Sequence, residues 1–430
     1  MPGPLTLSQV LEELHITDSA ALWQPYWEES MAGLAACPRP LPSREQILED
    51  SRWCGLSAAA GEELAAFAGR VENNPALLQL YWHCCCLLYD HEDYGKTGEW
   101  PYLTQVLGDE AGLFYLLVGL AMVPRVKEVH RKMGVPAEVS RETCLQIACF
   151  AGNYYRATGG KYGISLKQIY WLRHYTAGQL FRLGRFEYRI KPFQLPVEVY
   201  RHMKTGCTLA LAAAGWLFNG EGYIVGKEPN SELPGSWLSE MEYGERTVSG
   251  YPVSPFGMAL RRKVELNLDE WQCVLRRGDK TLDMHIPAGG GMTPEVCRAS
   301  FEQAPPFFAR FFPEEKVNAI TSSSWIFNNQ LQEITLSSDN LAAFQREIYL
   351  FPVLSSGRDG LWFIFLQDEF DPATAPRQTS LQRAVADYIQ AGNRWRGGGM
   401  FFLIPDLVEF GRQVYRRRWP ECLRLAGAAE

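Results

Sequence analysis

The stretch 280–312 is expected to form a strand, a glycine-rich turn and a helix, and this order constrains the fold more than any other feature of the chain. Its first residues alternate polar and apolar side chains at the period of two that is typical of a half-buried strand. Thr293 followed by Pro294 predicts an N-cap and the first residue of a helix. We therefore expect a strand over 280–286, a turn over 287–292 and a helix over 294–311.

Three consecutive glycines, Gly289, Gly290 and Gly291, form the centre of this turn and can adopt backbone angles that other residues avoid. A helix N-terminus carries unpaired N–H groups and a partial positive charge, so glycines before it let a pyrophosphate approach the backbone closely. The spacing matches neither G-x-G-x-x-G nor G-x-x-x-x-G-K-S/T, and no lysine follows inside the expected helix. A phosphate-binding turn and a purely structural turn therefore both stay open.

Composition restricts the partners of the chain. Its 430 residues exceed the size at which one hydrophobic core usually suffices, which predicts about two or three domains. The net charge of −7 and the lack of a long basic tract argue against nucleic acid as a partner. The 11 cysteines show neither disulfide nor zinc spacing, which favours a reducing cytoplasm. No metal is expected, because the densest set of possible ligands points in different directions along one helix. This set is His83, Cys84, Cys85, Cys86 and His91.

No membrane partner is expected either. The first residues lack a basic region followed by an apolar run, so they do not form a secretory signal. The segment AGLFYLLVGLAMV at 111–123 is the most apolar of the chain, but it is too short to span a bilayer. We therefore expect it to form a buried core helix of a cytoplasmic protein.

The chain changes character near Leu183. Before this residue, apolar side chains recur at helical spacing, with N-caps available at Ser43, Asn74 and Ser165. After it, strand-like runs dominate, with helical stretches between several of them. The segment 227–257, rich in Gly, Pro, Ser and Glu, predicts a long irregular loop. The expected organisation is a helical domain over 1–182, a mixed α/β domain over 183–405 and a C-terminal helix over 406–430.

Five stretches of the sequence carry a resemblance to a known family. They are LGRFEYRI at 183–190, GDKTLDMHIPAGGGMTPEVC at 278–297, SFEQAPPFFARFFPE at 300–314, SSSWIF at 322–327 and LQRAVADYIQAGNRWRGGGMFF at 381–402. Together they resemble a bacterial family of acyltransferase-domain proteins. The resemblance covers most of the chain and implies an α+β fold, in which an all-helical N-terminal domain precedes a GNAT-like mixed α/β domain with a central, partly splayed sheet.

The resemblance also implies an order of elements after the first helix. We expect a second strand over 318–326, splayed from the first, then helical pieces over 328–347 and closing strands over 348–354 and 360–366. In GNAT folds acyl-CoA lies between the splayed strands and against the turn, so acetyl-CoA or another acyl-CoA is the implied cofactor. By position, its contacts would be Ile286, Ala288, Gly289, Gly290, Gly291, Met292, Thr293 and Asn328. The usual turn of the superfamily is Q/R-x-x-G-x-G/A, and this chain has PAGGGMT instead.

Acyl transfer to an amine needs a base for the amine proton, a donor for the oxyanion and an acid for the departing thiolate. His285 ends the strand that would carry the thioester and is the candidate base. Asp283 shares its strand face and could orient the imidazole, while Ser324 offers a hydroxyl from the second strand. A histidine beside an Ile-Pro corner is more often a hydrogen-bonded structural residue, so both roles of His285 stay open.

Two further features have alternative interpretations. The segment RWRGGG at 394–399 could contact an anion such as a CoA phosphate, or could be the turn before the strand MFFLIP, and the turn is slightly favoured. Cys297 lies in the first turn of the expected helix, where a thiolate would be stabilised. No histidine stands beside it in the sequence, which favours a buried small side chain.

The sequence thus predicts an N-acyltransferase that passes an acyl group from acyl-CoA to an amine by direct attack. The acceptor would be an amine-bearing small molecule or peptide. The alternative is a non-catalytic, GNAT-derived module that binds a small molecule or regulates another process and has lost the CoA turn.

Overall fold

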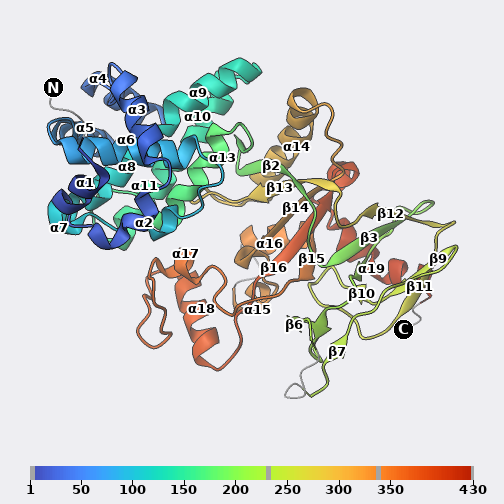
Figure 1. Ribbon diagram of the computed structural model, residues 1–430. Helices are drawn as coiled ribbons and strands as arrows, with labels where there is room; N and C mark the ends of the chain where they lie inside the picture. The colour runs from blue at the N-terminus through green and yellow to red at the C-terminus, as the bar shows by residue number, and fades with distance from the viewer. Residues whose placement is uncertain (1–4, 229–233, 336–339, 428–430) are drawn as a thin grey trace. The chain divides into compact units, whose positions relative to one another are not determined.

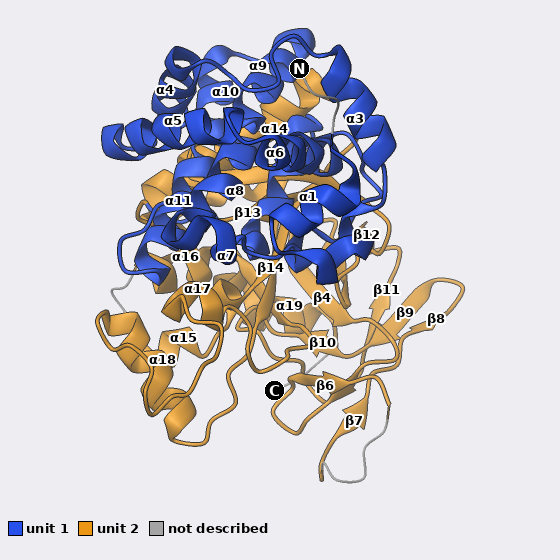
Figure 2. Cartoon of the chain, turned by 60° about the vertical axis from the view of Figure 1, so that its left-hand side comes forward, with its two compact units in different colours: residues 1–183, 287–289 blue, residues 184–286, 290–430 orange. Residues whose placement is uncertain are grey.

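The computed structural model describes residues 5–228, 234–335 and 340–427. The chain divides into two compact units, which Figure 2 shows in different colours. Unit 1 contains residues 1–183 and 287–289, and unit 2 contains residues 184–286 and 290–430. The chain therefore enters unit 2 at Gly184 and returns to unit 1 only for the three residues that follow Ile286.

Unit 1 is helical, as predicted, and ends in one short strand, β1 (Phe181–Leu183). The side chains of Ser43, Asn74 and Ser165 accept hydrogen bonds from backbone amides at three helix starts, so these N-caps are confirmed. The α-helices are α1 (Leu7–Glu13), α2 (Ala20–Trp23), α3 (Trp27–Ala36), α4 (Arg44–Trp53), α5 (Ala58–Glu72), α6 (Pro75–Tyr89), α7 (Thr104–Leu107), α8 (Ala111–Leu120), α9 (Met122–Met133), α10 (Ala137–Cys144), α11 (Gln146–Ala157), α12 (Leu166–Ile169) and α13 (Arg173–Thr176).

The apolar segment at 111–123 forms the centre of the core of unit 1. All the residues of α8 are buried, and they pack with apolar side chains of the surrounding helices. The helical run Thr104–Met133 is long and apolar enough to cross a membrane by length and composition alone, but 72% of its most apolar window is buried. The expectation of a buried core helix is therefore confirmed.

The histidine and cysteines of α6 belong to the same core. Both ring nitrogens of His83 have partners, because Nδ1 lies 2.8 Å from Ser30 Oγ and Nε2 lies 2.9 Å from the Trp23 carbonyl oxygen. Burial lowers the pKa of His83 to about 4, so the ring is neutral at pH 7. Cys84 and Cys85 are buried. These side chains contribute to packing, and His83 is fully engaged by protein groups.

Unit 2 combines strands with helices. Its strands are β2 (Phe186–Pro192), β3 (Val197–His202), β4 (Thr208–Ala212), β5 (Leu217–Phe218), β6 (Ile224–Gly226), β7 (Trp237–Leu238), β8 (Glu242–Tyr243), β9 (Thr247–Gly250), β10 (Pro252–Val253), β11 (Val264–Asn267), β12 (Trp271–Leu275), β13 (Lys280–His285), β14 (Ala319–Ser324), β15 (Tyr349–Pro352) and β16 (Gly398–Leu403). Its α-helices are α14 (Pro294–Phe311), α15 (Leu331–Ile334), α16 (Asn340–Glu347), α17 (Leu361–Phe365), α18 (Ser380–Gln390) and α19 (Val414–Leu425).

The central sheet of unit 2 has the order β2-β13-β14-β16-β15, and its middle strands lie side by side in Figure 1. β13 is antiparallel to β2 and parallel to β14, while β16 is antiparallel to both β14 and β15. Three smaller antiparallel sheets have the orders β10-β4-β3-β12, β11-β9-β8 and β6-β5-β7. The structure therefore confirms an α+β fold with a mixed central sheet.

One face of the central sheet is apolar and is covered by α14. Leu282 and Met284 of β13 are fully buried, as their alternation with polar residues predicted. The hydroxyl of Tyr188 on β2 lies 2.9 Å from Ser300 Oγ on α14, and the ring of Phe301 lies 5.3 Å from that of Phe402 on β16. The other face of β13 is thereby left for its polar side chains.

The expected strand over 360–366 is wrong, because this segment contains the helix α17. Leu361, Ile364 and Phe365 are buried, whereas Phe363 is 58% exposed, which is the spacing of one helical face. A run of six apolar residues has no internal periodicity, so the sequence could not distinguish a strand from a buried helix. β16 takes the place of the second closing strand.

Two other segments differ from expectation in detail. The long irregular loop expected over 227–257 contains the short strands β7, β8, β9 and β10 in its described part, while residues 229–233 lie outside the described residues. The stretch expected as a C-terminal helix over 406–430 begins within a 3₁₀ turn (Ile404–Glu409) and continues into α19, while residues 428–430 lie outside the described residues. Both segments belong to unit 2.

Candidate active site

The parallel strands β13 and β14 separate at their C-terminal ends. Their pairing ends at Asp283 and Thr321, although both strands continue beyond these residues. β13 stays paired with β2 as far as His285, and β14 stays paired with β16 as far as Ser324. The outer neighbours therefore hold the two strands in place while the backbone groups between them stay unpaired with one another.

A side-chain hydrogen bond crosses this opening. The hydroxyl of Ser322 on β14 donates to the carbonyl oxygen of Met284 on β13 over 2.7 Å. One residue before Ser322 on β14, the hydroxyl oxygen of Thr321 lies 2.8 Å from that of Thr281 on β13. This contact joins the strands where they are still paired. These contacts define the position at which the strands separate.

Asp283 is the centre of a charged cluster on the polar face of β2 and β13. Its Oδ2 atom lies 3.0 Å from His285 Nε2, 3.0 Å from Arg189 Nε and 3.9 Å from Lys191 Nζ. Asp283 and Arg189 lie directly opposite each other across the two strands, and so do His285 and Glu187. Alternation along β2 and β13 therefore brings all of these side chains to one face.

The charge cluster keeps Asp283 ionised. Burial alone raises the pKa of this carboxyl group, but the hydrogen bond from His285 and the charges of His285, Lys191 and Arg189 lower it below its usual value. Because an ionised carboxylate only accepts hydrogen bonds, Nε2 of His285 carries the proton in this contact. In the neutral form of the ring, Nδ1 is then the nitrogen without a proton.

A cavity of about 160 Å³ lies beside this cluster, at the point where the two strands separate. It brings together the two predicted side chains Asp283 and His285 with three consecutive residues of β14, 321–323. The lining residues are Lys191, Pro192, Phe193, Gln194, Leu195, Thr281, Asp283, His285, Thr321, Ser322 and Ser323. The cavity is large enough for the reacting end of a ligand rather than for a whole cofactor.

The glycine turn follows β13 directly and has the backbone angles that only glycine adopts easily. Gly289 and Gly290 have φ angles of 84° and 67°. The carbonyl oxygen of Gly291 accepts a hydrogen bond from Arg185 Nε over 3.0 Å. Ala288, whose carbonyl oxygen accepts from Cys149 Sγ over 3.4 Å, is exposed like the three glycines, whereas Ile286 is half-buried.

The helix that follows the turn begins as predicted. Thr293 is the N-cap of α14, Pro294 is its first residue, and Met292 and Thr293 are half-buried. The carboxylate of Glu295 lies in the first turn, where the backbone amides lower its pKa. The N-terminus of α14 therefore stabilises a negative charge, which is the property that a phosphate-binding turn requires.

The other predicted site residues lie at the C-terminal end of β14 and just after it. Ser324 is the N-cap of a 3₁₀ turn, and its Oγ atom accepts from the Ile326 amide over 3.4 Å. Asn328 is 1% exposed, and its Oδ1 atom accepts from the Gln330 amide over 3.1 Å. Their roles in binding or catalysis stay predictions.

Cys297 is fully buried in α14. Burial raises the pKa of its thiol to about 12, so the group is neutral at pH 7. The favoured interpretation of Cys297 as a small buried side chain is confirmed.

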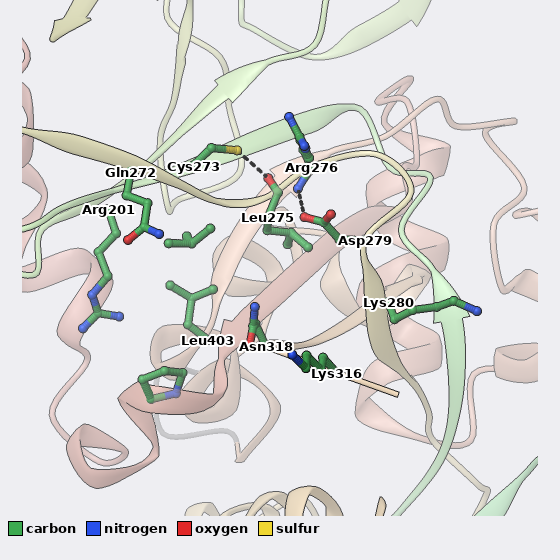
Figure 3. Close-up of a pocket in the computed structure, with 12 residues that line it drawn as sticks. Arg201, Gln272, Cys273, Leu275, Arg276, Asp279, Lys280, Lys316, Asn318 and Leu403 are labelled. Atoms are coloured by element: carbon green, nitrogen blue, oxygen red, sulfur yellow. Dashed lines mark hydrogen bonds between the residues drawn. The ribbon is translucent and has the colours of Figure 1, made fainter. Parts of the chain in front are cut away.

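A larger cavity of about 650 Å³ lies at the opposite edge of the sheet (Figure 3). Its lining includes Lys280, the first residue of β13, Asn318, which precedes β14, and Leu403, the last residue of β16. Since β13 and β14 are parallel, these residues mark the edge away from the separated strand ends. The larger cavity therefore lies away from the separated strand ends, and its volume alone does not make it the reaction site.

Sequence reasoning missed the basic residues around Asp283. Arg189 and Lys191 alternate with apolar residues in FEYRIKP, so a polar strand face was visible in the sequence. Which residue of β2 faces Asp283 depends on the register between the two strands, and a single sequence does not contain that information.

Comparison with known proteins places this geometry in a family. Residues 180–402 match the family described as a GNAT-like C-terminal domain, and residues 48–178 match an N-acyltransferase N-terminal domain. This chain belongs to the GNAT-like C-terminal domain family. The predicted resemblance to proteins that pair a helical domain with a GNAT-like domain is confirmed. No curated protein sequence matches the chain.

Solved structures share the fold of this GNAT-like protein. One is an acyltransferase in complex with decanoyl-CoA and teicoplanin, with 22% identity, a TM-score of 0.63, and coverage of 93% of this chain and 100% of that chain. Another is a mutant acyltransferase in complex with octanoyl-CoA, with 22% identity, a TM-score of 0.62, and coverage of 93% and 99%. At this identity the likeness shows that the fold is shared over nearly the whole chain.

Proposed function

We propose that this protein is an acyl-CoA-dependent N-acyltransferase. The observation that carries the proposal is the separation of the parallel strands β13 and β14 at Asp283 and Thr321, followed by the glycine turn and the N-terminus of α14. The separated strands no longer pair with each other there, which leaves room for an extended ligand between them, and the helix N-terminus offers positive charge to its phosphates. The solved acyltransferases of the same fold, which hold octanoyl-CoA and decanoyl-CoA, support this assignment.

In this mechanism the amine nitrogen attacks the thioester carbonyl carbon, the carbon–sulfur bond breaks, and CoA leaves as the thiolate. His285 takes the proton that the attacking amine loses, while Asp283 holds the ring through Nε2. The proton on the imidazolium then neutralises the departing thiolate. The positive charge that develops on His285 is stabilised by the carboxylate 3.0 Å away.

The hydroxyls of β14 differ in what they are able to donate. Ser322 uses its single proton on the Met284 carbonyl oxygen, so it is not the oxyanion donor. Ser324 accepts a hydrogen bond from the Ile326 amide, which leaves its own proton for another acceptor. Ser323 is exposed and lines the cavity. Ser323 and Ser324 are therefore the hydroxyl donors that we propose for the oxyanion.

For the acceptor we propose an amine-bearing small molecule or peptide. The solved acyltransferase that holds teicoplanin together with decanoyl-CoA supports an acceptor of this size. For the acyl donor, the octanoyl and decanoyl groups in the solved structures favour a medium-length chain over an acetyl group.

The second candidate function is a non-catalytic binding module, which the departure of PAGGGMT from the usual turn favours. Calorimetric titration with octanoyl-CoA, decanoyl-CoA, acetyl-CoA and free CoA distinguishes the two. The enzyme should bind the acyl-CoA thioesters and, with a panel of amines, release free thiol in proportion to amide formed. Lack of both calorimetric binding and a thermal shift at millimolar acyl-CoA would falsify the transferase assignment.

A further inference from the structure

Arg396 is a buried arginine with guanidinium nitrogens that lack a partner. The residue is only 8% exposed, and neither its Nε nor its Nη1 atom has a hydrogen-bond partner. In the described part of the chain, no carboxylate lies within ion-pair distance of it. Burial and the nearby charge of Arg394 lower the pKa of this guanidinium. A buried cation without a paired anion destabilises the fold, so the burial of Arg396 needs an explanation.

The other arginine that is equally buried shows how this chain normally treats such a group. Arg173 is 7% exposed, and its guanidinium donates to two backbone carbonyl oxygens, that of Tyr94 over 2.7 Å and that of His91. Arg173 therefore has a structural role, as a clamp on the loop that follows α6. Nε and Nη1 of Arg396 make no such hydrogen bonds, so the structure does not explain why these two donors are buried.

The segment that carries Arg396 is held rigidly from both sides. Arg394 Nη2 donates to the Ser355 carbonyl oxygen over 3.0 Å, and the Gly397 amide donates to Ser355 Oγ over 3.1 Å. Between them, Trp395 Nε1 donates to the Asp359 carbonyl oxygen over 2.8 Å. The position of Arg396 is therefore fixed before any ligand arrives, which lowers the entropic cost of binding.

Sheet register places Arg396 at the edge where the acyl group would react. Gly398, two residues later, pairs with Ser324 at the C-terminal end of β14. β13 ends at the same edge in His285, since β13 and β14 are parallel. The strand order puts β14 between the turn that follows β13 and the segment that carries Arg396. Arg396 thus lies beyond β14, on the side away from the predicted pyrophosphate position.

An aromatic ring lies against the guanidinium, and an amide side chain contacts that ring. Its Cζ atom lies 4.4 Å from the ring centroid of Tyr223, whose hydroxyl lies 3.0 Å from Asn329 Nδ2. On either side of Asn329, the Nδ2 atom of Asn328 and the Oε1 atom of Gln330 are buried without a hydrogen-bond partner. The charges nearest to Arg396 include Glu221 and Arg394, and Glu333 acts on Tyr223. The surroundings suit a planar or aromatic ligand with an anionic group.

We propose that Arg396 binds an anionic oxygen group, a carboxylate or a phosphate, on the amine acceptor and so determines which acceptors are used. This inference rests on the proposed transferase function, because it concerns the second substrate of the same site. Of the segment RWRGGG, residues 394–397 form the connection before β16, and in this proposal that connection carries an anion-binding side chain. Arg396 positions the acceptor and takes no part in the proton transfer.

Binding of simple anions tests the site without knowledge of the natural acceptor. Sodium benzoate and phenyl phosphate are the probes, and benzamide is the neutral control of the same shape, each titrated by calorimetry into the full-length protein. We expect benzoate or phenyl phosphate to bind at least about tenfold more tightly than benzamide, and R396Q to lose about tenfold or more of that affinity. R396K, which keeps the charge but not the fork of donors, should fall between them.

R383Q is the control, because Arg383 is an exposed arginine on α18 whose guanidinium donates to the carbonyl oxygens of Arg377 and Gln378 and does not hold the segment of Arg396. Its anion affinity should equal that of the unsubstituted protein. Equal benzoate affinity in R396Q and the unsubstituted protein, or no binding of either anion to the unsubstituted protein, overturns the proposal. Binding of octanoyl-CoA without binding of either anion would support the proposed function and overturn the anion site. Binding of an anion without binding of octanoyl-CoA would support the anion site and contradict the proposed function.

Thermal stability gives a second test that does not depend on a ligand. Replacing an unpaired buried cation by an apolar side chain of similar length should stabilise the unliganded protein, so the Tm of R396M should rise by about 2 °C or more. R173M should lower the Tm, because it leaves two carbonyl oxygens without donors. A fall of Tm in R396M like that in R173M would make Arg396 a structural residue and overturn the proposal.

The source of the anionic group needs one more comparison, since CoA also carries phosphates. If Arg396 serves the acceptor, R396Q binds octanoyl-CoA and its 3′-dephospho form as tightly as the unsubstituted protein does. A loss of octanoyl-CoA affinity in R396Q of tenfold or more, absent with the dephospho form, would assign Arg396 to the 3′-phosphate and overturn the acceptor role.

Discussion

Nε2 of His285 lies 3.0 Å from Oδ2 of Asp283, and both side chains extend from the same face of β13 at the point where this strand separates from β14. Asp283 is held in turn by Arg189, 3.0 Å away on the neighbouring strand. The imidazole is therefore oriented by a carboxylate that is itself fixed by a guanidinium. The arrangement would suit a base and would equally suit a hydrogen-bonded structural residue, so both roles of His285 stay predictions.

Replacement of His285 by Gln separates these two roles. If His285 is the base, His285→Gln should reduce kcat by about 10²- to 10⁴-fold while the affinity for octanoyl-CoA changes little, because the base acts only in the chemical step. Thiol release measured with a reactive amine, combined with calorimetry, gives both quantities. His202→Gln is the control, since His202 lies on β3 and its Nδ1 atom contacts Thr205. Equal turnover in the two variants would remove His285 from the mechanism.

Asp283 makes the stability of the protein depend on pH. The pKa of its carboxyl group is lower in the folded protein than the usual value of about 3.9 in an unfolded chain. The group therefore stabilises the fold above that unfolded value, and the stabilisation is lost as the pH falls through the lower folded value. Asp283→Asn should lower the free energy of unfolding at pH 7 by about 2 kcal/mol, and the difference should shrink as the pH falls below about 3.9.

Urea unfolding of both proteins between pH 3 and pH 7 measures this difference. The control is Asp269→Asn, because Asp269 forms an exposed ion pair with Arg246 that should contribute little at any pH. A destabilisation of Asp283→Asn that stays constant over the whole range would show that packing, and not the charge of Asp283, accounts for it.

The local order around the site was predictable from the sequence. The expected strand over 280–286 is β13, and the expected helix over 294–311 has the same ends as α14. These elements are specified by local signals: alternation in the strand, a Thr-Pro start for the helix and glycines at the two positive φ angles. Asp283 and His285 could be placed on one face for the same reason, since only their separation along one strand matters.

Features that depend on tertiary pairing were not predictable. The contact of Arg189 with Asp283 requires the register of β2 against β13, and a shift by one residue would turn Arg189 to the other face. The burial of Arg396 depends on packing against Tyr223, which is 173 positions earlier in the chain. The short apolar run at 361–366 has no periodicity that excludes a strand, so only packing determines that it forms α17.

Gly360 allows a test of whether packing makes the run at 361–366 form α17. It precedes α17 with a φ of 70°, and a Cβ atom built on it would lie 1.9 Å from Cδ1 of Trp325. Gly360→Ala should therefore destabilise unit 2 by about 3 kcal/mol or more, because both the backbone angle and the ring contact oppose the added atom. Gly392→Ala, with a φ of 84° and no atom within 4 Å of the added Cβ, should show only the smaller backbone cost. Equal unfolding midpoints of the two variants in urea would contradict this packing.

The turn before α14 supplies the most direct test of acyl-CoA binding. Gly290 has a φ of 67°, and an added Cβ atom would meet only the side chain of Arg185, at 3.6 Å, so Gly290→Ala should cost only about 1 kcal/mol of stability. If the turn holds the pyrophosphate, the same methyl group obstructs its approach to the backbone, and the affinity for octanoyl-CoA should fall by about tenfold or more. Gly159→Ala is matched in strain, with a φ of 69° and no atom within 4 Å of the added Cβ, and it lies after α11 in unit 1. Both variants should therefore lose similar stability in urea, while only Gly290→Ala loses affinity in calorimetry. Unchanged affinity in Gly290→Ala would show that PAGGGMT is a structural turn and that the phosphates of the donor are held elsewhere.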